Sequence, residues 1–262
     1  MEDTVKHCLI EINGRTAIIT INRSPTNTLS KETLYELEAI FNQLELNKSV
    51  GAIVLTGSGE KTFSGGADVS EFGEMLDGDT ADATLKRMHE FFNKVESFPK
   101  PVIACINGKA LGGGNELQMA CHLAIASESA ELGLPEVRLG IMPGYGGTQR
   151  LPRLIGQRRA LELMLGGDRI SAQKALELGL VNRVVPQEQL LDEAINWAKQ
   201  LAAGPPLAIK GILDAVVRGG SSVLNEGLEI ERENVKTVMT SEDAVEGVTA
   251  FFSKKQPSFK GR

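Results

Sequence analysis

The fifteen residues VIACINGKALGGGNE, from Val102 to Glu116, contain the pattern that decides the fold. The run Val102–Ile106 is short, apolar and rich in β-branched residues, which is typical of a buried strand. A glycine run, Gly112–Gly114, follows, and a helix is expected from Asn115. A strand, a glycine turn and a helix in this order indicate an α/β architecture.

The same order of elements is predicted upstream. Val5–Ile21 alternates apolar and polar residues around Asn13-Gly14, which predicts a β-hairpin with a type I′ turn. Ser30 is expected to cap a helix of about four turns. One face of that helix gathers apolar residues at a spacing of three and four: Leu34, Leu37, Phe41 and Leu44. A further buried strand is predicted at Ala52–Leu55.

Downstream, the pattern changes from mixed to helical. A helix over 85–98, broken by Pro99 and Pro101, precedes the central strand, and another strand is expected at 123–126. After Pro186 three helices are predicted, over 190–203, 207–217 and 223–240. We therefore expect a core domain over 1–200 and a helical C-terminal region over 201–262 that packs on the core or on a neighbouring subunit.

Composition and charge exclude several classes of protein. The chain has 262 residues, of which 42% are hydrophobic and 24% charged, so it can bury a sizeable core. Its net charge of −6 disfavours nucleic-acid binding. The acidic start Met1–Asp3 does not suit a signal peptide, and no apolar run reaches the roughly 18 residues of a membrane helix. A cytoplasmic protein with neither nucleic-acid nor membrane partners is expected.

Cysteine and histidine usage gives no sign of a metal site. The three cysteines form no CxxC pair, and the three histidines are far apart in sequence. We therefore expect neither a disulfide framework nor a metal centre. His122, at the end of an apolar helix, is expected to be a core histidine with satisfied hydrogen bonds.

Glycine clusters are the first features that indicate chemistry. The segment 56–62 half resembles a phosphate loop, but Glu60 stands before Lys61, where that motif requires glycine. Phe63–Asp68 and Ala110–Glu116 both follow predicted strands, and glycine there lets a ligand approach backbone N–H groups. Two such donors aimed at one point would stabilise an oxyanion. Spacing alone fits tight turns and close helix–sheet packing equally well.

Two carboxylates, Glu116 and Glu136, accompany these glycines. Taken singly, each suits a solvated surface charge or a charge at a helix N-terminus. Beside an anion site, however, two carboxyls with separated pKa values can each handle one proton while holding a water. Ser64 and Ser70 lack a nucleophile-elbow context, which argues against a serine hydrolase.

The same residues resemble the crotonase (enoyl-CoA hydratase/isomerase) family over essentially the whole chain. The matching motifs, in order, are Ile21–Pro25, Asn27–Ser30, Phe63–Asp68, Asn107–Glu116, Leu134–Gly140 and Pro143–Arg150. The resemblance implies a crotonase-like α/β spiral of repeated ββα units with a helical C-terminal trimerisation region. It also implies a homotrimer or a dimer of trimers.

Carried over by motif position, the resemblance assigns the site. The N–H groups of Ala67 and Gly113 would form the oxyanion hole for a thioester carbonyl. Glu116 would act as base on the water that attacks C3, and Glu136 would deliver a proton to C2. The resemblance implies an acyl-CoA substrate and no separate cofactor. The residues expected to bind substrate or CoA are Gly65, Ala67, Asp68, Val69, Ser70 and Gly113.

The presence of both glutamates favours an enoyl-CoA hydratase, which reversibly adds water across the 2,3 double bond of a 2-enoyl-CoA in fatty-acid or related acyl-CoA degradation. The alternatives are a Δ3-Δ2 enoyl-CoA isomerase that uses mainly Glu136 and a non-catalytic acyl-CoA-binding protein. A mobile loop over 71–79, with Phe72, Met75 and Leu76, is expected to wall the acyl pocket. Lys254 or Lys255 is a candidate partner for a nucleotide phosphate. Asn115 and His122 depart from the family pattern.

Overall fold

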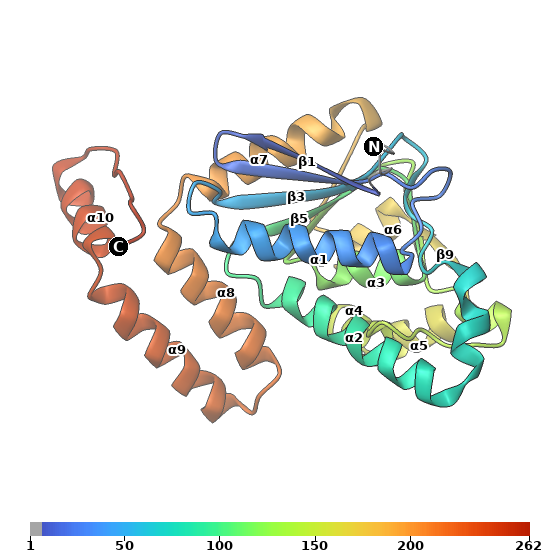
Figure 1. The fold of residues 1–262 in the computed structure, drawn as a ribbon. Helices are drawn as coiled ribbons and strands as arrows, with labels where there is room; N and C mark the ends of the chain where they lie inside the picture. The colour runs from blue at the N-terminus through green and yellow to red at the C-terminus, as the bar shows by residue number, and fades with distance from the viewer. Residues whose placement is uncertain (1–6) are drawn as a thin grey trace, which may run out of the picture.

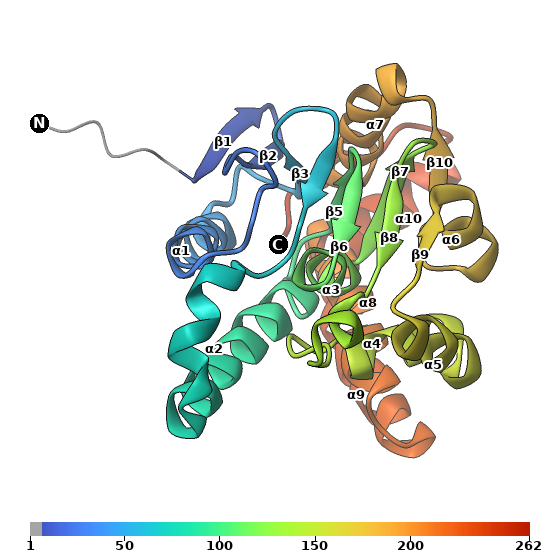
Figure 2. The same ribbon diagram turned by 90° about the vertical axis from the view of Figure 1, so that its right-hand side faces the viewer.

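The computed structural model describes residues 7–262, apart from the side chains of residues 74–76. Two sheets form its centre (Figure 2). The larger has the order β1-β2-β3-β5-β7-β10: β1 (Cys8–Asn13), β2 (Thr16–Ile21), β3 (Ala52–Gly57), β5 (Val102–Ile106), β7 (Leu123–Ser127) and β10 (Arg183–Val185). The smaller has the order β4-β6-β8-β9: β4 (Thr62–Ser64), β6 (Lys109–Leu111), β8 (Glu131–Gly133) and β9 (Arg169–Ser171). The predictions for residues 1–6, and for the side chains of Met75 and Leu76, lie outside the described residues.

A ββα unit occurs three times, as predicted. Each unit places its first strand in the larger sheet, its second in the smaller sheet, and then a helix: β3-β4-α2, β5-β6-α3 and β7-β8-α4. Within each sheet these strands are parallel, and among residues 7–262 only β1–β2 and β8–β9 pair antiparallel. The second strands therefore all end at the same edge of the smaller sheet.

The N-terminal hairpin is confirmed, but its predicted turn type is wrong. Asn13 pairs with Thr16, so the two loop residues are Gly14 and Arg15. A type I′ turn needs positive φ at both loop residues, and only Gly14, at 59°, has it. Arg15 carries a Cβ, which disfavours that region.

The central strands β3 and β5 of the larger sheet are buried on both faces because their side chains alternate between two apolar clusters, whereas the edge strand β1 is mostly exposed. Ile53 and Leu55 of β3 pack with α1, whereas Ala52 and Val54 pack with α7. Figure 1 shows α1 and α7 on opposite faces of the sheet. The predicted cap of α1 is confirmed, since the Ser30 side chain accepts a hydrogen bond from the N–H of Thr33. The helices of the core are α1 (Lys31–Leu46), α2 (Gly78–Glu96), α3 (Gly113–Ala120), α4 (Gly147–Ile155), α5 (Gln157–Gly166), α6 (Ala172–Leu178) and α7 (Leu190–Ala202), with the 3-10 helices η1 (Val69–Leu76), η2 (Glu136–Leu139) and η3 (Gln187–Gln189).

The segment 71–79 was expected to be a loop, and this is wrong. Its first part belongs to η1, and α2 already begins at Gly78. Asp68 caps η1 by accepting from the N–H of Ser70, and Asp77 caps α2 by accepting from the N–H of Thr80. Two short capping residues therefore convert an acidic, glycine-containing stretch into helix.

The C-terminal residues form three helices: α8 (Pro206–Gly220), α9 (Leu224–Met239) and α10 (Glu242–Ser253). They extend to one side of the sheets in Figure 1. Helices α8 and α9 pack on each other, α9 has no buried residue, and Phe251 and Phe252 of α10 are each 79% exposed. No helix among residues 7–262 combines the length and apolarity needed to cross a bilayer.

Candidate active site

The ends of three neighbouring strands supply the parts of the candidate site. Residues 65–67 follow β4, residues 112–113 follow β6, and Glu136 comes three residues after the end of β8. Because β4, β6 and β8 are adjacent and parallel, these segments meet at one sheet edge. All three segments line one cavity of about 700 Å3.

Two backbone N–H groups lie side by side in this cavity. A Cβ placed on Gly113 would lie 3.3 Å from the nitrogen of Ala67, and one on Gly66 would lie 2.9 Å from the nitrogen of Gly113. Glycine at position 66, with φ of 94°, is therefore required for this close approach. No acceptor within residues 7–262 takes the N–H of Ala67 or Gly113. Gly113 is the first residue of α3, so the helix field adds to the attraction for negative charge.

Glu116 projects from the first turn of α3 and is only 1% exposed. Its Oε1 atom accepts hydrogen bonds from the N–H groups of Tyr145, at 2.8 Å, and Gly147, at 2.7 Å. Burial raises the pKa of Glu116 to about 7, and the nearby Glu136 carboxylate acts in the same direction. Near neutral pH this carboxyl is therefore poised between its two protonation states.

Glu136 begins η2 and lines the same cavity. Its Oε2 atom is buried and has no hydrogen-bond partner within the described residues. Burial raises the pKa of Glu136, which favours the protonated form. The other oxygen, Oε1, would lie 3.1 Å from a Cβ on Gly112, so the absence of a side chain at Gly112 leaves room for the carboxylate.

The cavity wall is mostly apolar. Its apolar lining includes Phe72 and Leu85, and also Leu139, Ile141 and Met142. A few polar groups, including His89 and Gln149, complete the wall. An apolar cavity with a small number of polar groups is the usual form of a small-molecule site.

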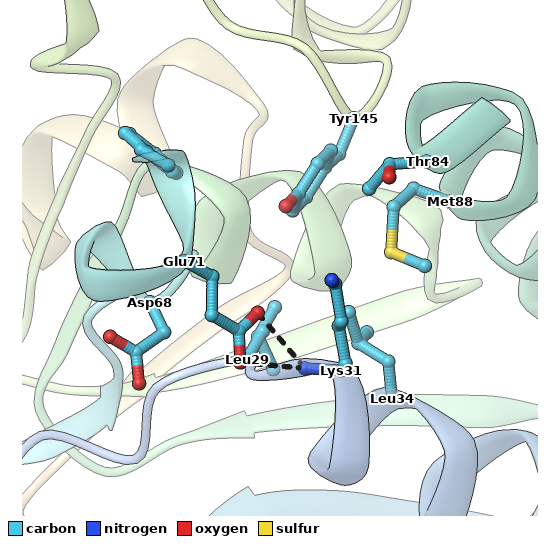
Figure 3. A pocket seen from close by; sticks show the side chains of 9 residues that line it. Leu29, Lys31, Leu34, Asp68, Glu71, Thr84, Met88 and Tyr145 are labelled. Atoms are coloured by element: carbon cyan, nitrogen blue, oxygen red, sulfur yellow. Dashed lines mark hydrogen bonds between the residues drawn. The ribbon is translucent and has the colours of Figure 1, made fainter. Parts of the chain in front are cut away.

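A second, smaller cavity of about 20 Å3 lies among residues that include Leu29, Glu71 and Tyr145 (Figure 3). Tyr145 and Phe72 border both cavities. Glu71 accepts hydrogen bonds from the backbone N–H of Lys31, at 3.2 and 3.3 Å, and so joins η1 to the start of α1. Burial raises the pKa of Glu71. This contact fixes η1, whose residues Val69 and Phe72 line the larger cavity.

The structure brings most of the expected site residues together. Six of them line the larger cavity: Gly65, Ala67, Val69, Gly113, Glu116 and Glu136. Asp68 and Ser70 do not. Asp68 Oδ1 accepts from both the N–H and the hydroxyl of Ser70, at 3.0 and 2.7 Å, and Asp68 pairs with Arg23. The Ser70 hydrogen bonds, followed by Arg23, lower the pKa of Asp68.

The C-terminal tail folds back on its own helix. Lys254 and Lys255 are exposed and line neither cavity. The N–H groups of Lys260 and Gly261 donate to Asp243 at 2.6 and 2.8 Å.

The two departures from the family pattern lie outside the cavity. His122 Nδ1 accepts from the N–H of Val102 at 3.0 Å, and its Nε2 lies 3.0 Å from the carbonyl of Glu96. Burial lowers the pKa of His122 to about 4, so it is the satisfied, neutral core histidine that was predicted. Asn115 Oδ1 accepts from Gln118 Nε2 at 2.9 Å inside α3.

Sequence reasoning did not identify three residues that matter here. Tyr145 donates to Glu116 and packs against Gly113, His89 lines the cavity, and Arg150 contacts the Tyr145 carbonyl. The glycine-rich segment Pro143–Arg150 was itself a visible signal. Within the described residues, no group of three or more histidine, cysteine or acidic side chains is arranged to hold a metal ion.

Comparison with known proteins identifies the family. The model of the enoyl-CoA hydratase/isomerase family matches residues 11–262. A probable enoyl-CoA hydratase of Bacillus subtilis is 41% identical, over 94% of this chain and 95% of that protein. A short-chain-enoyl-CoA hydratase of Clostridium acetobutylicum is 39% identical, over 98% of this chain and 99% of that protein.

The fold agrees. The crystal structure of an enoyl-CoA hydratase from Bacillus anthracis superposes with a TM-score of 0.93 at 41% identity, covering 98% of this chain and 100% of that one. The crotonase-like α/β fold predicted from the sequence is thereby confirmed. Because the family model and these relatives match nearly the whole chain, this protein belongs to the enoyl-CoA hydratase/isomerase (crotonase) family.

Proposed function

We propose that this protein is an enoyl-CoA hydratase, an enzyme that reversibly adds water across the 2,3 double bond of a 2-enoyl-CoA thioester. One observation carries the proposal: the buried carboxylate of Glu116, the half-buried carboxylate of Glu136 and two uncommitted backbone N–H groups share one apolar cavity. The relatives named as enoyl-CoA hydratases support it.

In this proposal the N–H groups of Ala67 and Gly113 donate to the thioester oxygen. Addition of a nucleophile at C3 of the enoyl group moves negative charge onto that oxygen as an enolate forms. The donors therefore stabilise the transition state more than the ground state, which is the requirement for catalysis. The N-terminus of α3 contributes in the same direction.

The two glutamates divide the proton transfers. Two N–H groups hold Glu116 Oε1, which leaves Oε2 to accept the proton of the attacking water as its oxygen bonds to C3. Glu136, whose pKa burial raises, gives its proton to C2. One proton enters through Glu116 and one leaves from Glu136, so the product gains one water and the chain's charge is unchanged.

The residues that contact the rest of the substrate are proposed from their positions around the cavity. We propose that Gly65, Ala67 and Val69 contact the CoA portion, and that Asp68 and Ser70 act indirectly, by shaping the start of η1. We also propose a homotrimer or a dimer of trimers built partly on the C-terminal region 201–262, because α9 buries no residue and Phe251 and Phe252 lie exposed.

The test is hydration of crotonyl-CoA, followed by the loss of conjugated-thioester absorbance and by mass analysis of the product. Glu136→Gln should lower turnover by about 100-fold or more while leaving CoA-ester binding intact, because the amide cannot supply the proton. Glu128→Gln, at an exposed glutamate, is the matched control. Unchanged hydration in Glu136→Gln would refute this mechanism.

Two alternatives have distinct outcomes. A Δ3-Δ2 enoyl-CoA isomerase would leave crotonyl-CoA unhydrated and convert a 3-enoyl-CoA to the conjugated ester. An acyl-CoA-binding protein would do neither and still bind the ester. The unpartnered Glu136 oxygen suits either enzyme, whereas the held and titratable Glu116 favours hydration.

A further inference from the structure

The segment 144–147, which comprises the end of the loop after η2 and the first residue of α4, orients Glu116 through two of its peptide groups. The N–H of Tyr145 belongs to the peptide whose carbonyl is that of Gly144, and the N–H of Gly147 belongs to the peptide whose carbonyl is that of Gly146. Because a peptide group is planar and trans, fixing the carbonyl also fixes the direction of the N–H. The partners of these carbonyls therefore decide where Glu116 is held.

Each carbonyl of this loop has a partner on the side away from Glu116. Gly144 O lies 2.7 Å from His89 Nε2 on α2. Gly146 O accepts from the backbone N–H groups of Gln149 and Arg150, at 3.0 and 2.9 Å. The carbonyl between them, Tyr145 O, accepts from Arg150 Nη1 at 3.2 Å.

The other two guanidinium nitrogens of Arg150, which lies on α4, bind side chains of α2. Its Nε and Nη2 atoms donate to Glu96 Oε2 at 3.1 and 2.8 Å, and Nη2 also donates to Asn93 Oδ1 at 2.7 Å. All three guanidinium nitrogens are thus engaged, and the residue is only 7% exposed. Arg150 thus links two side chains of α2, Glu96 and Asn93, to the Tyr145 carbonyl. We call this set of hydrogen bonds the Arg150 bracket.

Gly146 shows how closely the bracket fits the loop. A Cβ at Gly146 would lie 2.2 Å from Arg150 Nη1, so the guanidinium occupies the space that any side chain there would need. Phe92 of α2 adds an edge-on contact with the Tyr145 ring at 5.7 Å between centroids. The loop is therefore held against α2 by apolar packing and by the Arg150 bracket together.

We propose that Arg150 is a positioning residue. Its side chain holds the Tyr145 carbonyl, and with it the peptide that lies between the two donor peptides. It thereby keeps the loop placed so that the Tyr145 and Gly147 N–H groups aim Glu116 at the attacking water. The proposal rests on the proposed role of Glu116 as base. Arg150 itself touches neither substrate nor the reacting atoms. Its positive charge also lowers the pKa of Glu116, against the larger effect of burial and the repulsion from Glu136.

The experiment separates geometry from charge with two substitutions. Arg150→Gln removes both. We expect kcat for crotonyl-CoA to fall on the order of 100-fold with KM little changed, since misplacement by about 1 Å has effects of that size. The acid limb of the kcat profile should also move to higher pH, because loss of the positive charge raises the pKa of Glu116. Arg150→Lys keeps the positive charge but loses the planar guanidinium with its several donors. The acid limb of the kcat profile should therefore stay near its wild-type pH, while kcat remains below that of the wild type.

Two further variants control for indirect effects. Glu96→Gln weakens the hydrogen bonds between Arg150 and α2. Because Glu96→Gln and Arg150→Gln disrupt the same set of contacts, the effect of the double variant on kcat should be much smaller than the sum of the two single effects, expressed as free energies. Arg158→Gln removes an exposed arginine of α5 and serves as the charge control. Thermal unfolding of every variant checks that the compared proteins are folded.

A substrate-free measurement separates this proposal from the proposed function. The 13C NMR titration of the Glu116 carboxyl, assigned with Glu116→Gln, should show a higher midpoint in Arg150→Gln than in the wild type. A wild-type protein that does not hydrate crotonyl-CoA would refute the function, and the titration would still decide the link between Arg150 and Glu116. An unmoved midpoint would overturn the proposal, as would wild-type kcat in either Arg150→Gln or Arg150→Lys.

Discussion

Glu116→Gln should make the protein more stable at pH 8 than the wild type and lose that advantage as the pH falls. Glutamine keeps an oxygen that can accept from the N–H groups of Tyr145 and Gly147, so the two hydrogen bonds can remain. It removes only the charge, which burial penalises. The variant therefore isolates the energetic cost of ionised Glu116.

The size and sign of the effect follow from the pKa of Glu116, which lies near 7 in the folded protein against 4.5 for an ordinary glutamate. Because the folded-state pKa is raised, the wild type has its full stability below about pH 4.5 and loses part of it as the pH rises to about 7. Such a shift corresponds to about 3 kcal/mol at pH 8 and less than about 1 kcal/mol at pH 5. The stability difference between variant and wild type should therefore shrink by about 2 kcal/mol between these two pH values.

The assay is urea unfolding of both proteins from pH 5 to pH 8.5 at one protein concentration. Any constant offset, such as an unpaired amide proton in the variant, does not affect the slope of the difference with pH. Glu60→Gln, at an exposed glutamate, is the charge-matched control. A difference that stays flat, or that grows toward acid pH, would refute the assignment of Glu116 as a buried carboxyl with a raised pKa.

Three further predictions concern packing and the catalytic proton. Gly114→Ala should destabilise the protein by roughly 1–3 kcal/mol in urea unfolding, because the added Cβ would lie 2.3 Å from the Ser64 carbonyl oxygen. His122→Leu should cost about 1–3 kcal/mol, since it leaves the N–H of Val102 unpaired, and a variant with wild-type stability would contradict the core role of this histidine. The wild-type kcat/KM for hydration should fall about tenfold per pH unit below pH 7, as Glu116 of the free enzyme becomes protonated, and a kcat/KM independent of pH from 5 to 7 would contradict its role as base.

Much of the larger sheet and its helices could be predicted because burial leaves a pattern: burial on one face makes a helix periodic, and burial on both faces makes a strand a continuous apolar run. The spacing around Phe41 gave α1, and the short apolar runs gave β3 and β5. The strands of the smaller sheet are three residues long, for example β6 (Lys109–Leu111), and such a length holds too few residues to show a period. The start of α2 lies in the polar residues after Asp77, whose capping role depends on local geometry.

The individual residues of the candidate site could be predicted from the sequence, but the hydrogen bonds between them could not. The glycine runs and the two glutamates stand out in the sequence, and their match to the family motifs assigned their roles. The hydrogen bonds from Tyr145 and Gly147 to Glu116 join residues about 30 positions apart, and no local pattern encodes such a pairing. The side-chain bracket of Arg150 on α2 spans more than 50 positions and is equally invisible. The domain boundary near 200, the trimeric assembly and the cytoplasmic location stay predictions.

The threefold ββα repeat has an evolutionary consequence. Each second strand delivers a separate component: Ala67 follows β4, Gly113 follows β6, and Glu136 comes shortly after β8. The two N–H groups of Ala67 and Gly113 therefore come from other repeats than Glu136, the proposed proton donor. In the proposed mechanism, a single codon change at position 136 would remove the group that protonates C2 and leave the two N–H donors to the thioester oxygen in place. If that mechanism holds, the step that follows enolate formation can change by mutation independently of the two N–H donors.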